Sequence, residues 1–224
     1  MKKIVAVLLT FLIFISSGVS AFGSTELLLE KGIISGDEGG LRPYDNVLRG
    51  EFAKMLCNTF GFKMRKDAFF SDVSKDKWYY GYITALYERG LLMGDEKGHM
   101  NPEDFITRAE MAAILGRITG TSMMDIPFKD KDSIPDWATP YVSKLYTLTI
   151  ITGNDDNTFA PDALLTREEC FLILTRFLER EFAGGEGSKD NPYLITEVYQ
   201  FHNIKKNPFA SYRLDKDLDF TGCF

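Results

Sequence analysis

Three arginines at a fixed spacing are the residues of this chain best suited to binding an acidic ligand. Arg49, Arg108 and Arg167 are each the second residue of a four-residue motif, and the motifs begin at positions 48, 107 and 166. A guanidinium holds a carboxylate or phosphate through two parallel hydrogen bonds, and a helix N-terminus favours the same anions. The spacing therefore points to an anion site. An arginine tied to a neighbouring acid or to loop carbonyls is an equally good interpretation.

The two tryptophans of the chain keep the same interval. Trp78 and Trp137 are 59 residues apart, and each follows a stretch with an aspartate, Asp72 in the first case and Asp130 or Asp132 in the second. A tryptophan that anchors a core is the common alternative. A tryptophan at a helix start near an arginine also suits the apolar face of a sugar ring, so both interpretations stay open.

These residues belong to a repeat of 59 residues that organises most of the chain. Pro43, Pro102 and Pro161 share the interval with the arginines and tryptophans. Each unit is predicted to be a helix, a loop and a second helix that begins at the four-residue motif. In unit two the first helix is expected over about residues 78–89, because apolar residues recur there at i, i+3, i+4, i+7 and i+8.

The motif and the loop also have local structural explanations. Thr107 and Glu110 have the spacing of a capping box, in which each side chain accepts a hydrogen bond from the other's backbone amide, and unit three repeats it. The capping box does not explain the arginine, because a cation in the first turn opposes the helix dipole. The loops around Gly94 and Gly153 are rich in aspartate, but they lack the glycine and the final glutamate of an EF-hand. Turns are therefore predicted there, and no metal site.

Unit one is incomplete. Its first helix is reduced to about residues 25–31, and it has neither a tryptophan nor a lead-in aspartate. Leu48 and Gly50 replace the threonine and alanine of the motif, which weakens the start of its second helix. We therefore expect fewer than three working sites.

The N-terminus has the parts of a secretory signal peptide. Lys2 and Lys3 precede an apolar run from Ile4 to Ile15, and small residues follow up to Ala21. The run is shorter than the ~20 apolar residues that a membrane-spanning helix needs. Residues 1–21 are therefore predicted to be a signal peptide, and the mature chain is expected to be exported with no membrane span.

Composition argues against several classes of function. The chain has 224 residues and a formal net charge of -6, which argues against a general nucleic-acid binder. Two histidines and three cysteines leave little room for a histidine-based metal site or a disulfide scaffold. Cys57 and Cys170 are expected to be small buried hydrophobes, and Cys223 lies next to the C-terminus. No cofactor, metal or catalytic residue is expected.

Three features together resemble the S-layer homology (SLH) repeat. They are the Phe70-Ser71-Asp72-Val73 lead-in to Trp78, the Gly-Asp loop and the Thr-Arg-Ala-Glu motif. Three tandem copies behind a signal peptide are the usual arrangement of that family. The resemblance implies a mainly α fold, with three helix-loop-helix repeats in a pseudo-threefold, three-pronged arrangement. The repeats would span residues 22–65 (N-terminally incomplete), 66–123 and 124–182.

The resemblance also implies a function and a set of binding residues. SLH repeats hold exported proteins non-covalently on the Gram-positive cell wall. Their partner is a secondary cell-wall polysaccharide, commonly with pyruvylated sugars, bound in grooves between repeats. Carried over position by position, the polysaccharide-binding residues would be Arg49, Arg108, Arg167, Trp78, Trp137, Asp72, Asp130, Gly94 and Gly153. The chemistry is consistent, because a pyruvate ketal carries a carboxylate that arginine can hold.

The C-terminal part has a different pattern. After a Gly-rich linker at 183–190, residues 191–224 are predicted to form a strand, a short helix and a second strand. This order resembles the entry to right-handed parallel β-helix domains of secreted surface proteins, including GLUG-repeat adhesins. Because a β-helix needs several stacked coils, we expect a truncated start of such a domain. Asp215, Asp217 and Asp219 alternate on the second strand, but no partner cleft is visible and no enzyme activity is expected.

The leading hypothesis is therefore a wall-anchoring, carbohydrate-binding module at the cell surface. The alternative is a truncated adhesin or polysaccharide-active β-helix protein, whose repeats bind peptidoglycan or self-assemble.

Overall fold

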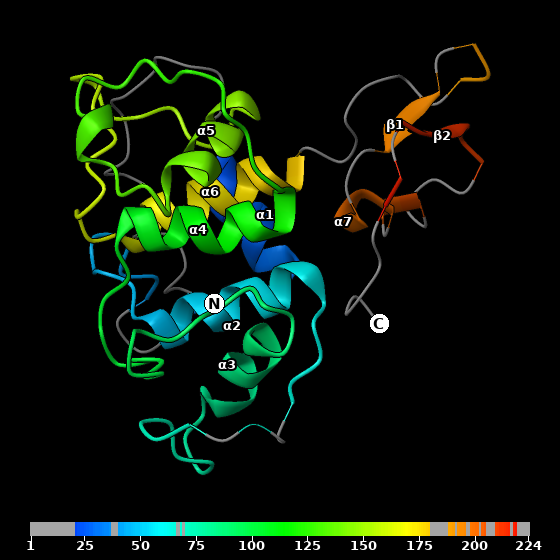
Figure 1. Cartoon of the computed structure of the whole chain (residues 1–224). Helices are drawn as coiled ribbons and strands as arrows, with labels where there is room; N and C mark the ends of the chain where they lie inside the picture. The colour runs from blue at the N-terminus through cyan, green and yellow to red at the C-terminus, as the bar shows by residue number, and fades with distance from the viewer. Residues whose placement is uncertain are drawn as a thin grey trace, which may run out of the picture.

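The computed structural model describes residues 21–36, 40–65, 68, 70–179, 188–190, 192–195, 198–201, 203–204, 209–215 and 217–218. The predicted signal peptide up to residue 20, most of the predicted linker, Cys223 and Asp219 lie outside these residues. The described part is mainly helical, as expected, with one small sheet (Figure 1). The elements in chain order are α1 (Ala21–Glu30), α2 (Arg49–Phe60), α3 (Tyr80–Tyr87), α4 (Arg108–Thr119), η1 (Lys131–Ser133), α5 (Thr139–Thr147), α6 (Arg167–Glu179), β1 (Tyr193–Ile195), α7 (Val198–Phe201) and β2 (Tyr212–Leu214).

Each prong of the fold pairs helices from two different repeats. Helix α2 packs against α3, α4 against α5, and α6 against α1 (Figure 1). In every pair the second helix of one repeat meets the first helix of the next, and the third pair returns to the start of the chain. The short first unit therefore still supplies α1, whose Leu28 is fully buried. The repeats form a closed ring of three.

A triangle of backbone hydrogen bonds lies at the centre of this ring. Val47 N–H donates to the carbonyl of Leu165, Ile106 N–H to that of Val47, and Leu165 N–H to that of Ile106, at 2.9, 2.9 and 3.0 Å. The three residues are 59 positions apart and have no exposed side-chain surface. The pseudo-threefold arrangement is therefore confirmed. Its centre is a buried junction in which each repeat contacts both of the others.

The second helices all begin at this junction, and the neighbouring repeat satisfies their first amides. The amides of Arg108 and Ala109 donate to the carbonyls of Ala163 and Pro161, both at 2.9 Å. Helices α2 and α6 repeat these contacts with Asp104 and Pro102, and with Asp45 and Pro43. Amides at a helix N-terminus have no partner within the helix. Here they are used to join the repeats, so they are not open to a ligand.

Two departures of the first repeat have structural reasons. Leu48 cannot accept a hydrogen bond, but its amide still donates to Glu51 at 3.1 Å, which keeps half of the capping box. A Cβ on Gly50 would lie 3.1 Å from the Cβ of Tyr79 and from the Pro102 carbonyl oxygen. The glycine makes room for the tyrosine, whereas the equivalent positions in repeats two and three are both alanines, Ala109 and Ala138.

The first helices differ in length from the sequence expectation. Helix α1 begins at Ala21, four residues before the predicted start, and α3 covers only Tyr80–Tyr87 of the range 78–89. Trp78 therefore lies in the turn before α3, outside the helix. Helix α3 ends early because Gly90 (φ 64°) closes a turn, with its amide 2.8 Å from the Tyr87 carbonyl.

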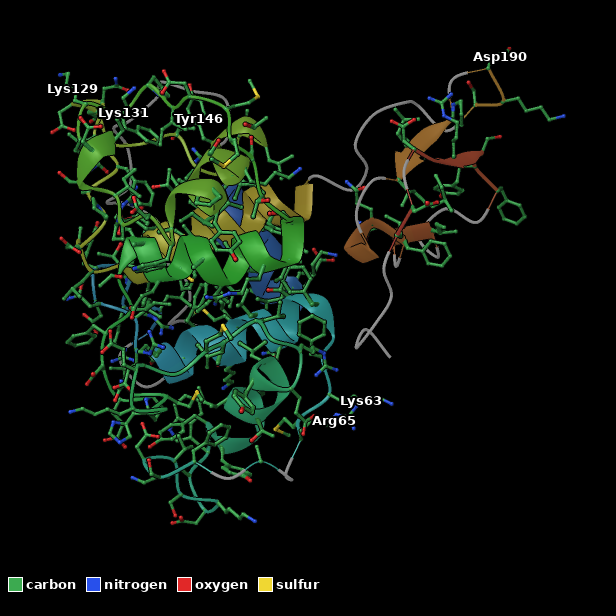
Figure 2. The ribbon with its side chains drawn as sticks, in the orientation of Figure 1. Lys63, Arg65, Lys129, Lys131, Tyr146 and Asp190 are labelled. Carbon is green, nitrogen blue, oxygen red and sulfur yellow. The ribbon has the colours of Figure 1, made fainter. Side chains whose placement is uncertain are left out.

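The C-terminal strands pair in parallel. Tyr193 is opposite Tyr212 and Ile195 is opposite Leu214, with α7 between the strands in the chain. Figures 1 and 2 show this unit, which includes Asp190, to one side of the helical repeats. A parallel pair needs a crossover connection, as the coils of a β-helix have. The resemblance to a β-helix entry itself stays a prediction.

Within the described residues, no helix is long and apolar enough to cross a membrane, and no group of histidine, cysteine and acidic residues is placed to hold a metal. Cys57 and Cys170 are buried free thiols, as predicted. Burial raises the pKa of the Cys57 thiol to about 12 and that of Cys170 further. Both therefore stay protonated and behave as small apolar residues.

Candidate functional site

The predicted binding residues gather where one repeat meets the next. We call the contact between repeats one and two junction A, with Arg49, Asp72, Trp78 and Gly94. Junction B, between repeats two and three, has Arg108, Asp130, Trp137 and Gly153. Junction C joins repeat three to repeat one and has Arg167. The Arg and Asp of junction A converge on adjacent loop residues, and those of junction B do the same, as the following contacts show.

Each arginine reaches from the start of its helix to the loop of the next repeat. The Nε of Arg49 donates to the Met100 carbonyl at 2.9 Å, that of Arg108 to Phe159 at 2.7 Å, and that of Arg167 to Leu41 at 2.8 Å. The three arginines are only 8%, 7% and 6% exposed. Arg108 also lies over the Phe159 ring, 5.3 Å from its centroid. Each guanidinium is thus fixed in a mostly buried position.

The same arginines form a closed ring of ion pairs with the motif glutamates. Arg49 Nη1 is 2.6 Å from Glu110 and Arg108 Nη1 is 3.0 Å from Glu169. The third pair, between Arg167 and Glu51 at 3.4 Å, closes the ring. The structure therefore realises the alternative in which each arginine is tied to an acid and a loop carbonyl. A direct contact with a ligand stays a prediction.

Each glutamate of the ring has two tasks. Its Oε1 receives the arginine of the preceding repeat, while its Oε2 accepts the backbone amide at its own helix cap. The Oε2 atoms of Glu110 and Glu169 lie 3.0 and 2.8 Å from the amides of Thr107 and Thr166. Sequence reasoning assigned the glutamates only the cap. Their recurrence alongside the arginines was the available signal for the ion pair.

The lead-in aspartates hold the loop that the arginines also contact. Asp72 Oδ2 accepts the amide of Asn101 at 2.7 Å. Asp130 accepts two amides, from Phe159 and Ala160, each at 2.7 Å. Asn101 and Ala160 have φ values of 49° and 54°, so the aspartates support a left-handed backbone that is costly for non-glycine residues. Asp130, and not Asp132, is therefore the counterpart of Asp72.

The two aspartates differ in how fully they are used, and this difference predicts different effects of amidation. Asp72 Oδ1 is buried without a hydrogen-bond partner, whereas both oxygens of Asp130 accept amides. In Asp130→Asn the new NH2 group replaces one accepting oxygen and faces the backbone N–H of Phe159 or Ala160, so one hydrogen bond is lost. We expect a loss of about 2 kcal/mol in unfolding free energy for Asp130→Asn, and about 1 kcal/mol or less for Asp72→Asn. Urea titrations of the two variants measure this, and equal losses would contradict the hydrogen-bond assignment.

The tryptophans are on the surface. Trp78 and Trp137 are 52% and 53% exposed, so the alternative of a core anchor is wrong for both. Trp78 packs edge-on against Tyr79 and Tyr82, with ring centroids 5.2 and 6.5 Å apart. The Nζ of Lys54, from α2, lies 5.9 Å from the centroid of the Trp78 ring. Sequence reasoning missed Lys54, because it occurs in one repeat only.

The loop glycines have a steric explanation. A Cβ on Gly94 would lie 2.8 Å from the backbone carbon of Gly98. A Cβ on Gly153 (φ 76°) would lie 2.5 Å from Cε1 of Phe128, a distance that no real Cβ contact adopts. Both positions therefore exclude any side chain for reasons of packing, and a role in ligand contact remains a prediction.

Glu103, near junction A, is shared by two donors of repeat two. The Tyr79 hydroxyl donates to Glu103 at 2.8 Å, and Lys77 Nζ is 3.3 Å from the same carboxylate. Burial and Glu103 raise the pKa of Tyr79 to about 12, and the hydrogen bond from Tyr79 lowers the pKa of Glu103. At neutral pH the tyrosine is a neutral donor and Glu103 is an anion.

Junction C lacks the aromatic and acidic parts. Counting back 59 positions from Trp78 and Asp72 gives Val19 and Ile13, which lie outside the described residues. Arg42 occupies the left-handed loop position (φ 47°), and it pairs with Asp45 at 3.2 Å. Junction C therefore keeps the arginine and glutamate of the ring without the exposed tryptophan.

Comparison with known proteins identifies the repeated unit. The family model for the S-layer homology domain matches residues 17–53, 69–112 and 127–170. The chain is 36% identical over 166 residues to the exoglucanase XynX of Acetivibrio thermocellus, which is 69% of this chain and 15% of that enzyme. It is 33% identical over 163 residues to the cellulosome-anchoring protein of the same organism (66% of this chain, 35% of that protein). It is 29% identical over 163 residues to an S-layer protein of Bacillus thuringiensis subsp. finitimus (68% and 19%). The chain thus spans a minor part of each of these relatives.

Proposed function

Because this chain belongs to the S-layer homology family, we propose that it is a cell-surface anchoring module that holds an exported protein non-covalently to the cell wall. The ligand that we propose is a secondary cell-wall polysaccharide with acidic, pyruvylated sugars. The observation that carries the proposal is the recurrence, at junctions A and B, of a half-exposed tryptophan together with an arginine and an aspartate that hold one loop. A cellulosome-anchoring protein and an S-layer protein among the relatives support it.

In the proposed complex the tryptophan is the main contact. An indole ring that is half exposed offers a flat apolar face, on which the C–H face of a sugar ring can stack. Arg49 and Arg108 use Nε and Nη1 to bind a loop carbonyl and a motif glutamate, and Nη2 is the part of each guanidinium that would donate to an oxygen of the sugar. The aspartates hold the loop that both groups share. No catalytic step forms part of this proposal.

We expect two working sites, at junctions A and B, and none at junction C. Junction C has an arginine but no tryptophan at the repeated position. Two sites on one repeating polymer strengthen binding through effective concentration, even where each site alone is weak. Net negative charge on the protein does not prevent this, because exposed charges beyond ~10 Å are screened at moderate salt.

Co-sedimentation with purified Gram-positive wall sacculi tests the proposal. The chain without its predicted signal peptide, residues 1–21, is expected to sediment with intact sacculi and to stay in the supernatant with sacculi stripped of secondary polysaccharide by acid. Sedimentation with both preparations would favour direct recognition of peptidoglycan. Failure to sediment with either preparation, by a chain whose circular dichroism shows it folded, would contradict anchoring.

A further inference from the structure

Junctions A and B differ in charge at the tryptophan. Lys54 lies against Trp78, and its Nζ is 5.9 Å from the ring centroid. The residue 59 positions later on α4 is Ala113, which is buried. The residue just before the tryptophan also changes, from Lys77 at junction A to Asp136 at junction B, and both are exposed. Between the two junctions, two lysines are thus replaced by an alanine and an aspartate.

Junction B has a cation of its own, because Arg117 lies over the Tyr141 ring at 5.7 Å where junction A has Asn58 at the repeated position. Arg117 Nη1 is bound to the Leu91 carbonyl at 2.8 Å. The residue after the repeated proline is acidic at both junctions. It is Glu103 at junction A and Asp162 at junction B. Repeat three adds Lys129 and Lys131 beside Asp130, but Lys131 Nζ is held by Asp125 at 2.8 Å. Figure 2 shows both lysines at the end of the molecule that includes Tyr146. Lys54 differs from them because its ammonium group lies at the ring on which a sugar would stack.

Lys54 is also well placed chemically for an anion. An ammonium beside an indole face gains cation–π attraction, which holds the charge at the ring. Lys77 is partly neutralised by Glu103 at 3.3 Å, whereas the Lys54 ammonium lies over the Trp78 ring itself. A carboxylate on a sugar stacked at Trp78 would then form a charge-assisted hydrogen bond with Lys54.

We propose that the two sites are specialised: junction A selects a sugar with an acidic substituent through Lys54, and junction B binds the sugar whether or not it is charged. This rests on the proposed function and assigns the charge selectivity to one residue at one of its two sites. A polymer with acidic groups on only some of its sugars would then bind in a fixed register, with an acidic unit at junction A.

The two tryptophans let each junction be measured separately. In Trp137→Phe the fluorescence reports Trp78 alone, and in Trp78→Phe it reports Trp137 alone, because the chain has two tryptophans. The probes are a methyl hexoside with a 4,6-O-(1-carboxyethylidene) ketal and the methyl ester of the same compound. We expect the acid to bind about tenfold more tightly than the ester at Trp78, and within about twofold at Trp137.

Variants at Lys54 identify the cause. In the Trp137→Phe protein, Lys54→Ala is expected to remove most of the preference for the acid, and Lys54→Arg to keep it. Lys189→Ala, which removes an exposed lysine outside the repeats, is the matched control for net charge. Equal acid-to-ester ratios at both tryptophans, or an unchanged ratio in Lys54→Ala, would overturn this inference and leave anchoring intact. Loss of all probe binding at both tryptophans, with the chain still sedimenting with walls, would instead contradict the proposed sites.

Discussion

Replacing both exposed tryptophans is expected to abolish wall binding and leave the fold intact. Trp78→Ala with Trp137→Ala removes the stacking face at junctions A and B. A tryptophan at the centre of a binding site commonly contributes about 2 kcal/mol or more, which is ~30-fold in affinity at each site. Because the two sites bind one polymer, losing both also removes the gain from avidity. Isothermal titration with isolated wall polysaccharide measures the loss, which we expect to exceed a hundredfold.

The same substitutions should have little effect on stability, since both rings are about half exposed. We expect the urea midpoint of the double variant to stay close to that of the parent chain. Phe105→Ala is a matched control, because Phe105 is also a large, half-exposed aromatic residue but is not one of the predicted binding residues. Unchanged affinity in the folded double variant would exclude the tryptophans as the binding surface.

The second large effect concerns the ring of ion pairs. Arg108→Met removes the hydrogen bond to the Phe159 carbonyl at 2.7 Å and the ion pair with Glu169 at 3.0 Å. The methionine keeps much of the apolar stem, but the loop carbonyl loses its donor. Glu169 is partly exposed and can be solvated after the change, so the main cost is the buried Phe159 carbonyl left without its charged donor. We expect a loss of about 2 to 3 kcal/mol in unfolding free energy.

Lys75→Met is the control for this experiment. Lys75 is exposed, and its replacement removes one positive charge, as Arg108→Met does. Urea unfolding of the two variants separates the structural task of Arg108 from a contact with ligand. If Arg108→Met unfolds at the same urea concentration as Lys75→Met but loses wall binding, the arginine acts on the ligand and its buried contacts contribute little to the fold.

The repeat itself could be predicted from the sequence because its signals are local and recur. The capping motif, the apolar stripe and the loop glycine each act within about ten residues, so an interval of 59 residues locates the helices. The central triangle of Val47, Ile106 and Leu165 also follows this interval. Asp130 was correctly placed as the counterpart of Asp72, although repeat three has one more residue before its tryptophan.

What the sequence could not give is the pairing between repeats. The exchange of helices between neighbouring repeats and the ion pair from Arg108 to Glu169 depend on how the ring closes. No local pattern distinguishes a glutamate that only caps a helix from one that also receives a distant arginine. The exposure of Trp78 and its contact with Lys54 likewise depend on α2, a helix from the preceding repeat.

Nuclear magnetic resonance of the indole groups tests the central claim most directly. The chain has two tryptophans, so a 15N-labelled sample gives two indole Nε1–H signals, which Trp78→Phe assigns by removing one. We predict that wall polysaccharide shifts both signals, and that the same polymer after acid removal of its ketals shifts mainly the signal of Trp137. If the polysaccharide binds the chain and neither signal moves, the wall is held at another surface and the account of junctions A and B is wrong.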